Sequence, residues 1–186
     1  MAHILIYGGT FDPPHIGHVQ LAKEAMEFLG CDTVLFIPAS ENPLKKRALH
    51  TSAQHRLAML TLALVDADWA EISEIELRRG GKSYTIDTLE SLQTEYPEDT
   101  RFTMLIGTDQ AVLFEQWHRY QDIEAIATIA VVSRRGIESS RFNALPLDEI
   151  DISSTMIRAC VQQGKPIDTY VDGRVHSYIS EHNLYK

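Results

Sequence analysis

The residues with the clearest chemical potential lie in one stretch, Gly8-Gly9-Thr10-Phe11-Asp12-Pro13-Pro14-His15-Ile16-Gly17-His18. It joins an apolar run, Ile4–Tyr7, which is typical of a buried strand, to an amphipathic run, Gly17–Leu29, which is typical of a helix. A glycine turn between a strand and a helix directs free N–H groups and the positive end of the helix dipole toward one point. The stretch therefore predicts an anion site, and Gly17 has no side chain that would keep a phosphate from the backbone.

Two histidines, His15 and His18, lie three positions apart and so share a face of the first helical turn. They suit a phosphate, and they also suit a metal ion. Histidines at this spacing without a third ligand nearby are weak evidence for a metal, so we expect no dedicated metal ligands. The Gly8-Gly9 pair taken alone is equally typical of a tight turn.

A second constellation lies at Asp151-Ile152-Ser153-Ser154-Thr155-Met156-Ile157-Arg158. Hydroxyls at a helix start cap free N–H groups and can also donate to a phosphate. Arg158 lies one turn further along, on the face of Ser154 and Thr155, where its guanidinium can fork onto phosphate oxygens. In isolation a plain capping sequence is the favoured interpretation. Beside the first stretch, a phosphate site is favoured.

These residues must be positioned by alternating strands and helices. We expect strands at Ile4–Tyr7, Thr33–Ile37, Glu71–Leu77, Arg101–Ile106 and Thr128–Val132. We expect helices at Gly17–Leu29, Ala53–Val65, Ile86–Glu95, Asp109–Ile126 (as two short helices), Ser154–Gln163 and Gly173–His182. Thr51 or Ser52 can cap the second helix and Thr85 the third. The alternation predicts a Rossmann-like α/β fold, with a parallel sheet and helices on both faces.

Composition sets the broader limits. A length of 186 residues suits a single domain over 1–186, in which 151–186 would form a C-terminal helical segment. The net charge of −9 argues against nucleic acid as a partner. With no membrane-length apolar run and no signal peptide, we expect no membrane partner and a cytoplasmic location. Cys31 and Cys160 are expected to be reduced. The oligomeric state stays open, and a homo-oligomer is compatible with the sequence.

Both constellations resemble the signature pair of the nucleotidyltransferase superfamily, Gly-[Thr/Ser]-Phe-Asp-Pro-x-His-x-Gly-His and Ile-Ser-[Ser/Thr]-Thr-x-Ile-Arg. Nearly the whole chain is similar to one branch, the bacterial nicotinate mononucleotide adenylyltransferases. The supporting strings are Asn42–Lys45, Arg56–Leu60, Ser83–Leu89, Ile106–Asp109, Trp117-His118, Val131–Arg134, Tyr178-Ile179 and Leu184-Tyr185. Two positions depart from the pattern: Leu44 stands where histidine is usual, and Arg135 stands where proline is usual.

The resemblance implies a reaction of ATP with nicotinate mononucleotide that gives deamido-NAD and pyrophosphate, a step of NAD biosynthesis. The attacking phosphate monoester is already ionised near neutral pH, so catalysis needs alignment and charge stabilisation rather than a strong base. Mg²⁺ would arrive on ATP, held mostly by phosphates and water.

The resemblance also implies roles for particular residues. His15, His18 and Arg158 would be catalytic, with His18 nearest the α-phosphate and Arg158 on the leaving phosphates. The remaining ATP-binding residues would be Gly8, Gly9, Thr10, Phe11, Lys45, Gly107, Asp109, Ser153, Ser154 and Thr155. The pyridine nucleotide would meet Thr85, Trp117, His118 and Arg134, although Trp117 also suits a place in the core. The carboxylates of 71–76 are expected to face solvent.

Other functions stay open at this point. Nicotinamide mononucleotide or phosphopantetheine is an alternative phosphate acceptor within the superfamily. A class I aminoacyl-tRNA synthetase shares the Pro14–His18 pattern, but it needs a lysine-rich signature and several hundred further residues. A non-catalytic nucleotide sensor would not need His15, His18 and Arg158.

Overall fold

The computed structural model describes residues 1–40, 51–133, 141–142, 144–148 and 150–186. Within these residues, six strands form one fully parallel sheet in the order β3-β2-β1-β4-β5-β6. Their bounds are β1 His3–Gly9, β2 Thr33–Pro38, β3 Ala70–Ile72, β4 Arg101–Gly107, β5 Ala127–Ser133 and β6 Ala144–Asp148. The chain reverses its direction of travel across the sheet between β1 and β4, which leaves a crevice at their carboxyl ends. The predicted Rossmann-like α/β fold is confirmed.

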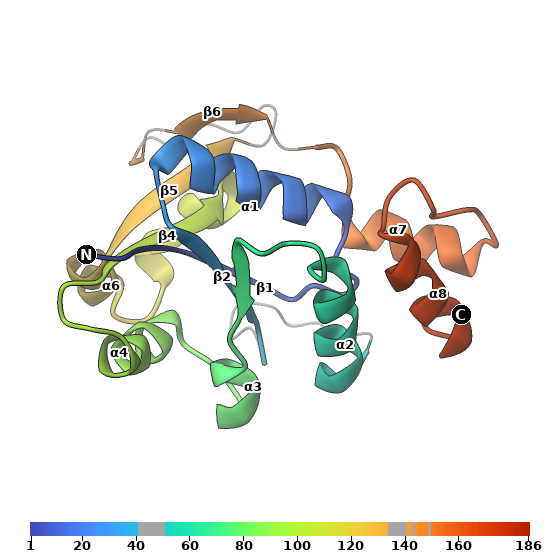
Figure 1. Ribbon diagram of the computed structural model, residues 1–186, viewed down its shortest axis with the longest axis horizontal. Helices are drawn as coiled ribbons and strands as arrows, with labels where there is room; N and C mark the ends of the chain where they lie inside the picture. The colour runs from blue at the N-terminus through green and yellow to red at the C-terminus, as the bar shows by residue number, and fades with distance from the viewer. Residues whose placement is uncertain (41–50, 134–140, 143, 149) are drawn as a thin grey trace.

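Helices connect and cover the strands. They are α1 Ile16–Leu29, α2 Ala53–Ala63, α3 Ile75–Arg79, α4 Thr85–Glu95, α5 Thr108–Ala111, α6 Tyr120–Ile126, α7 Ser154–Gln162 and α8 Gly173–Glu181, with a 3₁₀ turn η1 at Phe114–Gln116. Figure 1 shows α1 on one side of the sheet and α3 and α4 on the other, while α7 and α8 lie beyond α2. The helices therefore cover both faces, as predicted.

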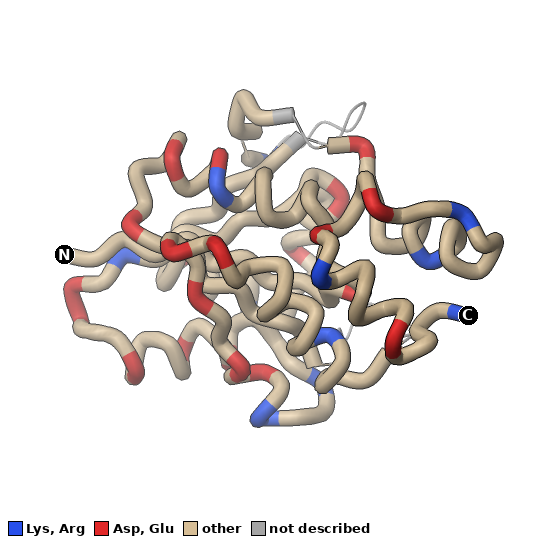
Figure 2. The backbone as a smooth tube through the Cα atoms, turned by 45° about the vertical axis from the view of Figure 1, so that its right-hand side comes forward, with Lys and Arg blue, Asp and Glu red and all other residues tan. Residues whose placement is uncertain are grey.

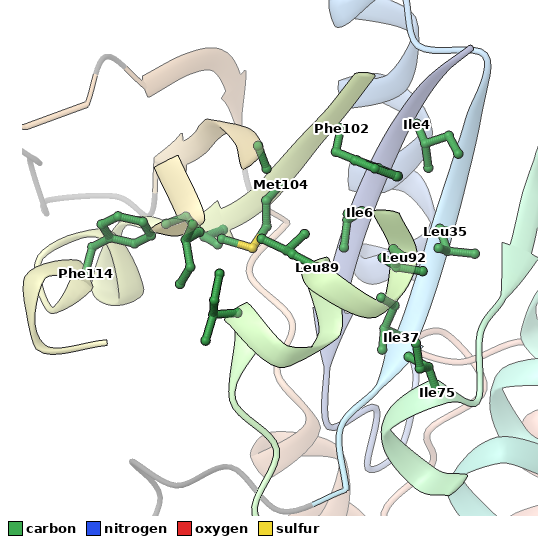
Figure 3. Close-up of a cluster of buried hydrophobic side chains, with 14 of the residues drawn as sticks. Ile4, Ile6, Leu35, Ile37, Ile75, Leu89, Leu92, Phe102, Met104 and Phe114 are labelled. Carbon is green, nitrogen blue, oxygen red and sulfur yellow. The ribbon is translucent and has the colours of Figure 1, made fainter. Parts of the chain in front are cut away.

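The β1 sequence explains how the sheet is held on both faces. Successive strand residues point to opposite faces, so Ile4 and Ile6 pack on one side and Leu5 on the other. Figure 3 shows the first of these clusters, in which Ile4 and Ile6 lie near Leu35 of β2 and Leu92 of α4. A strand buried on both faces is a continuous apolar run, which is what parallel sheets require.

A third cluster holds the C-terminal helices onto α2. It comprises Met59, Ile157, Ile167, Val171, Val175, Ile179 and Leu184, all of them buried. Residues 151–186 thus pack on α2 rather than on the sheet itself, and this placement brings the start of α7 next to the loop between β1 and α1.

The expected strand Glu71–Leu77 is only partly correct. β3 ends at Ile72, and α3 begins at Ile75 with Glu74 as its N-cap. The Ser73 N–H still donates to the Phe36 carbonyl oxygen at 2.9 Å, after which the chain leaves the sheet. A helix of five residues is too short for its periodicity to be distinguished from a strand.

Other boundaries also differ from the expectations. β6 was not predicted, and Thr85 is the first residue of α4 rather than its cap, since Tyr84 is the N-cap. Ser52 does cap α2, accepting from the His55 N–H. The segment expected as two short helices forms α5, η1 and α6.

Both cysteines are free thiols, with Cys31 buried and Cys160 half-buried. Burial raises the pKa of Cys31 to about 11, so this thiol stays protonated and unreactive at neutral pH. Figure 2 shows Lys and Arg positions scattered along the described backbone among the more numerous Asp and Glu positions. No helix in the described part of the chain is long and apolar enough to cross a membrane.

Candidate active site

A cavity of about 530 Å³ opens at the carboxyl ends of β1, β2 and β4. Parallel sheets bind ligands at this edge, where the strand order reverses. Seven of the residues predicted from the sequence line the cavity: Gly8, Gly9, Thr10, Thr85, Asp109, Trp117 and His118. The structure thus brings together residues predicted for both nucleotides.

His15 and His18 are not among the residues that line this cavity; they stand at the start of α1, just after the turn whose Gly8, Gly9 and Thr10 do line it. Their rings stack with centroids 3.5 Å apart, and Phe11 packs edge-on against His18. His15 is the N-cap of α1 and is 7% exposed, whereas His18 is half-buried. The two imidazoles therefore form one stacked pair at the positive end of the helix dipole.

A backbone contact determines which nitrogen of His18 carries its proton. The His15 N–H donates to Nδ1 of His18 at 3.2 Å, so Nδ1 is an acceptor and Nε2 carries the hydrogen. His18 can therefore donate to an anion only through Nε2.

Arg158 and Ser154 attach α7 to the loop that precedes α1. Arg158 donates through Nη1 to the Asp12 carbonyl oxygen at 2.7 Å and through Nη2 to Thr155 Oγ1 at 3.1 Å. Ser154 Oγ donates to the Pro13 carbonyl oxygen at 2.8 Å, and Ser153 caps the helix. The second motif thus lies against the first.

Gly9 and Phe11 have a structural role at the turn. A Cβ on Gly9 would lie 2.9 Å from the Phe11 ring, so only glycine fits above it. Phe11 itself is buried and adopts a positive φ of 48°. Its side chain belongs to the core below the turn and does not line the cavity. Gly8, in contrast, has open space where a side chain would project.

The opposite wall of the cavity is aromatic. Trp117 packs on Phe114 with ring centroids 5.3 Å apart, and His118 lies 4.7 Å from Tyr84 by the same measure. Trp117 is half-buried, so it packs on the core and lines the cavity at once. Thr85 begins α4 here, where the first N–H groups of a helix have no carbonyl partner within it.

Glu76 corrects one expectation. It was expected to face solvent, but it is half-buried and lines the cavity. Burial raises the pKa of the Glu76 carboxyl, while hydrogen bonds from Thr88 and Ser83 oppose that shift. Arg79 Nη1 donates to both of these hydroxyls, at 3.1 Å to Ser83 and 3.2 Å to Thr88. This chain of contacts fixes the segment just before Thr85.

Arg56 lies beside the turn before α1, a place that the sequence pattern does not predict for it. Its side chain is fully buried, and its Nη1 donates to the Thr10 carbonyl oxygen at 2.8 Å. Within the described residues its Nε and Nη2 atoms have no hydrogen-bond partner, and burial lowers its pKa. A signal of its burial is its helical spacing, since Arg56 shares a face with buried Met59 and Leu60.

Two predicted residues, Lys45 and Arg134, lie outside the described residues, as do the departures at Leu44 and Arg135. Within the described ranges, no three His, Cys, Asp or Glu side chains gather closely enough to hold a metal ion. The described site therefore offers histidine, guanidinium, hydroxyl and backbone N–H donors, which suit phosphate oxygens.

Comparison with known proteins assigns the family. A family model described as cytidylyltransferase-like matches residues 6–160. A probable nicotinate-nucleotide adenylyltransferase of Shouchella clausii (strain KSM-K16) is 39% identical over 188 residues, covering 100% of this chain and 97% of the relative. This chain belongs to the nicotinate-nucleotide adenylyltransferases, within the cytidylyltransferase-like family. The family's probable member in Bacillus pumilus (strain SAFR-032) is 36% identical over 189 residues, with 100% of both chains covered.

Solved adenylyltransferase structures share the fold. A putative nicotinate-nucleotide adenylyltransferase from Vibrio parahaemolyticus superposes with a TM-score of 0.76 at 22% identity, covering 100% of this chain and 96% of that one. The Plasmodium falciparum nicotinic acid mononucleotide adenylyltransferase, solved with NaAD, gives 0.82 at 18% identity, with 100% and 98% covered. At these identities the similarity shows the fold of the nicotinate-nucleotide adenylyltransferases and no more.

Proposed function

We propose that this chain transfers AMP from ATP to nicotinate mononucleotide, giving deamido-NAD and pyrophosphate, with the site residues in the roles that follow. The observation that carries the proposal is the grouping of His15, His18 and Arg158 around the turn between β1 and α1, whose Gly8, Gly9 and Thr10 line an aromatic-walled cavity. The phosphates of ATP would lie over the glycine turn and the α1 start. The pyridine ring would lie against Trp117.

The reaction follows from placing the ATP phosphates at the glycine turn and the pyridine ring at Trp117. The phosphate of nicotinate mononucleotide attacks the α-phosphorus of ATP, the bond to the bridging oxygen breaks, and pyrophosphate leaves with the electron pair. His18 Nε2–H donates to the α-phosphate oxygens, and Arg158 neutralises charge on the departing pyrophosphate. Mg²⁺ enters with ATP as the MgATP substrate and adds further charge compensation. No side chain needs to abstract a proton from the ionised nucleophile.

We expect the enzyme to prefer the acid, nicotinate mononucleotide, over the amide. The α4 N-terminus at Thr85 lines the cavity, and a helix start favours a carboxylate over a neutral amide. The carboxamide of nicotinamide mononucleotide would also point an N–H group at the Thr85 hydroxyl and backbone N–H, which are themselves donors. A mispaired buried donor costs about 1–3 kcal/mol, or about five- to over a hundredfold in specificity.

Specificity constants measured side by side for the two mononucleotides test this preference. Thr85→Val keeps the shape of the side chain and removes its hydroxyl. The ratio of the specificity constants for the acid and the amide should therefore become smaller, while pyrophosphate release from ATP continues. Equal or better use of the amide by the wild-type enzyme would overturn the substrate assignment and leave adenylyl transfer intact. Absence of pyrophosphate release with every acceptor would instead favour a nucleotide sensor.

Gly107→Ala should weaken ATP use selectively. A Cβ at this position would lie 2.8 Å from Asp109 Oδ1, so the carboxylate that we assign to a ribose hydroxyl of ATP must move. We expect KM for ATP to rise about tenfold, which corresponds to about one charge-assisted hydrogen bond. KM for nicotinate mononucleotide should stay unchanged. Steady-state kinetics with each substrate varied in turn would measure both constants. An equal rise in the two KM values would contradict the assignment of Asp109 to the ATP ribose.

A further inference from the structure

Asp12 joins three segments that are distant in the sequence. Its carboxylate oxygen Oδ1 accepts a hydrogen bond from the Thr51 hydroxyl and another from the Tyr185 hydroxyl, each at 2.7 Å. Its carbonyl oxygen accepts from Arg158 Nη1, also at 2.7 Å. Asp12 is 3% exposed, so these contacts are made away from bulk water. Short charge-assisted hydrogen bonds of this kind hold both partners firmly.

The segment after α8 places Tyr185 against Asp12. Leu184 is buried in the third cluster, and its N–H donates to the Ile179 carbonyl oxygen at 3.0 Å, so the chain turns back on the helix. Asn183 and Tyr185 both adopt the left-handed backbone region, with φ of 50° and 64°. This conformation is unfavourable for a bulky residue such as tyrosine and persists where the surrounding contacts require it.

The charges around Asp12 favour the same hydrogen-bond directions. Burial and the hydrogen bond to Asp12 raise the pKa of the Tyr185 phenol, so the hydroxyl stays protonated and acts as the donor. The buried Arg56 guanidinium interacts electrostatically with Asp12 and Tyr185, and it also holds the Thr10 carbonyl oxygen. The carboxylate is therefore surrounded by two hydroxyl donors and a cation.

We propose that Asp12 and Tyr185 are positioning residues, which fix the loop between β1 and α1 in the geometry that adenylyl transfer needs. Asp12 lies three residues before His15, and the carbonyl of Pro13 between them is held by Ser154. A loop held at both its side chain and its carbonyls presents the His15–His18 pair and Arg158 in one fixed arrangement. This role rests on the proposed function, because it acts through the phosphate-binding residues.

Tyr185→Phe tests the role because it removes only the hydroxyl. We expect kcat to fall about ten- to a hundredfold, since a misplacement of about 1 Å in reacting groups has an effect of this size. KM for nicotinate mononucleotide should not change, because the wall formed by Thr85 and Trp117 does not involve Asp12. Tyr178→Phe is the matched control: Tyr178 lies on α8 of the same C-terminal segment, and its hydroxyl bonds Nδ1 of His55 on α2 rather than Asp12.

Thr51→Val removes the other donor to the same oxygen and should lower kcat in the same direction. If both hydroxyls act through Asp12, the double variant should lose much less activity than the product of the two single effects. Thermal unfolding of each variant separates this role from a purely structural one. A structural role would lower the melting temperature and leave the kcat of the folded enzyme unchanged. If Tyr185→Phe does not fold, Thr51→Val alone carries the test.

Two results would overturn the proposal while the wild-type enzyme stays active with nicotinate mononucleotide. One is kinetics of Tyr185→Phe that match those of Tyr178→Phe. The other is a loss of kcat in the double variant that equals the product of the two single losses, which would mean that the two hydroxyls act independently. An inactive wild-type enzyme would contradict the proposed function itself, so the two failures are distinguishable.

Discussion

Replacing His18 with alanine is expected to lower kcat by on the order of a hundredfold or more, with the fold retained. A preorganised donor aimed at developing charge has an effect of this size when it is removed. His18 is half-buried on the first turn of α1 and its ring contacts Tyr7 and Phe11, but the substitution leaves in place the buried residues of the helix, which are Gly17, Leu21, Ala22 and Ala25. Single-turnover rates would measure the loss of activity, and a circular dichroism melt would check that the fold is retained. Near-normal turnover in a folded His18→Ala enzyme would contradict the assignment.

The tautomer of His18 allows a sharper version of this experiment. Because Nδ1 accepts from the His15 N–H, only Nε2–H can donate to phosphate. The amide nitrogen of glutamine lies close to the position of Nε2, and that of asparagine lies close to Nδ1. We therefore expect His18→Gln to retain more activity than His18→Asn or His18→Ala. The reverse order would place the catalytic hydrogen on Nδ1 and contradict the geometry.

Arg158→Ala is expected to lower kcat/KM for ATP by on the order of a hundredfold, because charge on the leaving pyrophosphate loses its guanidinium. Affinity for the dinucleotide product should change little, since that product lacks the β- and γ-phosphates. Arg158→Lys keeps the charge but not the planar fork, and its reach to the Asp12 carbonyl would be lost, so a measurable defect should remain.

Steady-state kinetics together with calorimetric titration of deamido-NAD would check the Arg158 prediction. A circular dichroism melt of each variant is the control for folding. Equal losses for ATP and for the dinucleotide would mean that Arg158 acts on a group common to both ligands. That result would remove its assignment to the leaving group.

The strand and helix pattern predicted most of the sheet because buried parallel strands are continuous apolar runs. β6 shows where this signal fails. It contains Pro146, which argues against a central strand, but β6 lies at the edge of the sheet, where a missing N–H is tolerated. Its Leu145 and Leu147 alternate inward, too few residues for the pattern to stand out.

The two motifs that we propose to bind phosphate stand out in the sequence because each lies in a continuous stretch with a local structural reason, a turn or a helix start. Their partners do not. Glu76 was assigned to the surface because nothing in its own segment shows that Ser83 and Thr88 fold over it. Tyr185 meets Asp12 only through tertiary packing, and no spacing rule relates residues so distant in the chain.

That same contact has a consequence for how the protein is made. The two residues are 173 positions apart, so the loop between β1 and α1 leaves the ribosome long before its partner does. At about 5–20 residues per second this interval is roughly 9–35 s. Throughout it, the nascent chain carries both histidines but lacks the hydroxyl that holds their loop in place. The Tyr185 contact therefore cannot assist the early steps of folding, and the loop reaches its final arrangement only after the C-terminal segment has been made.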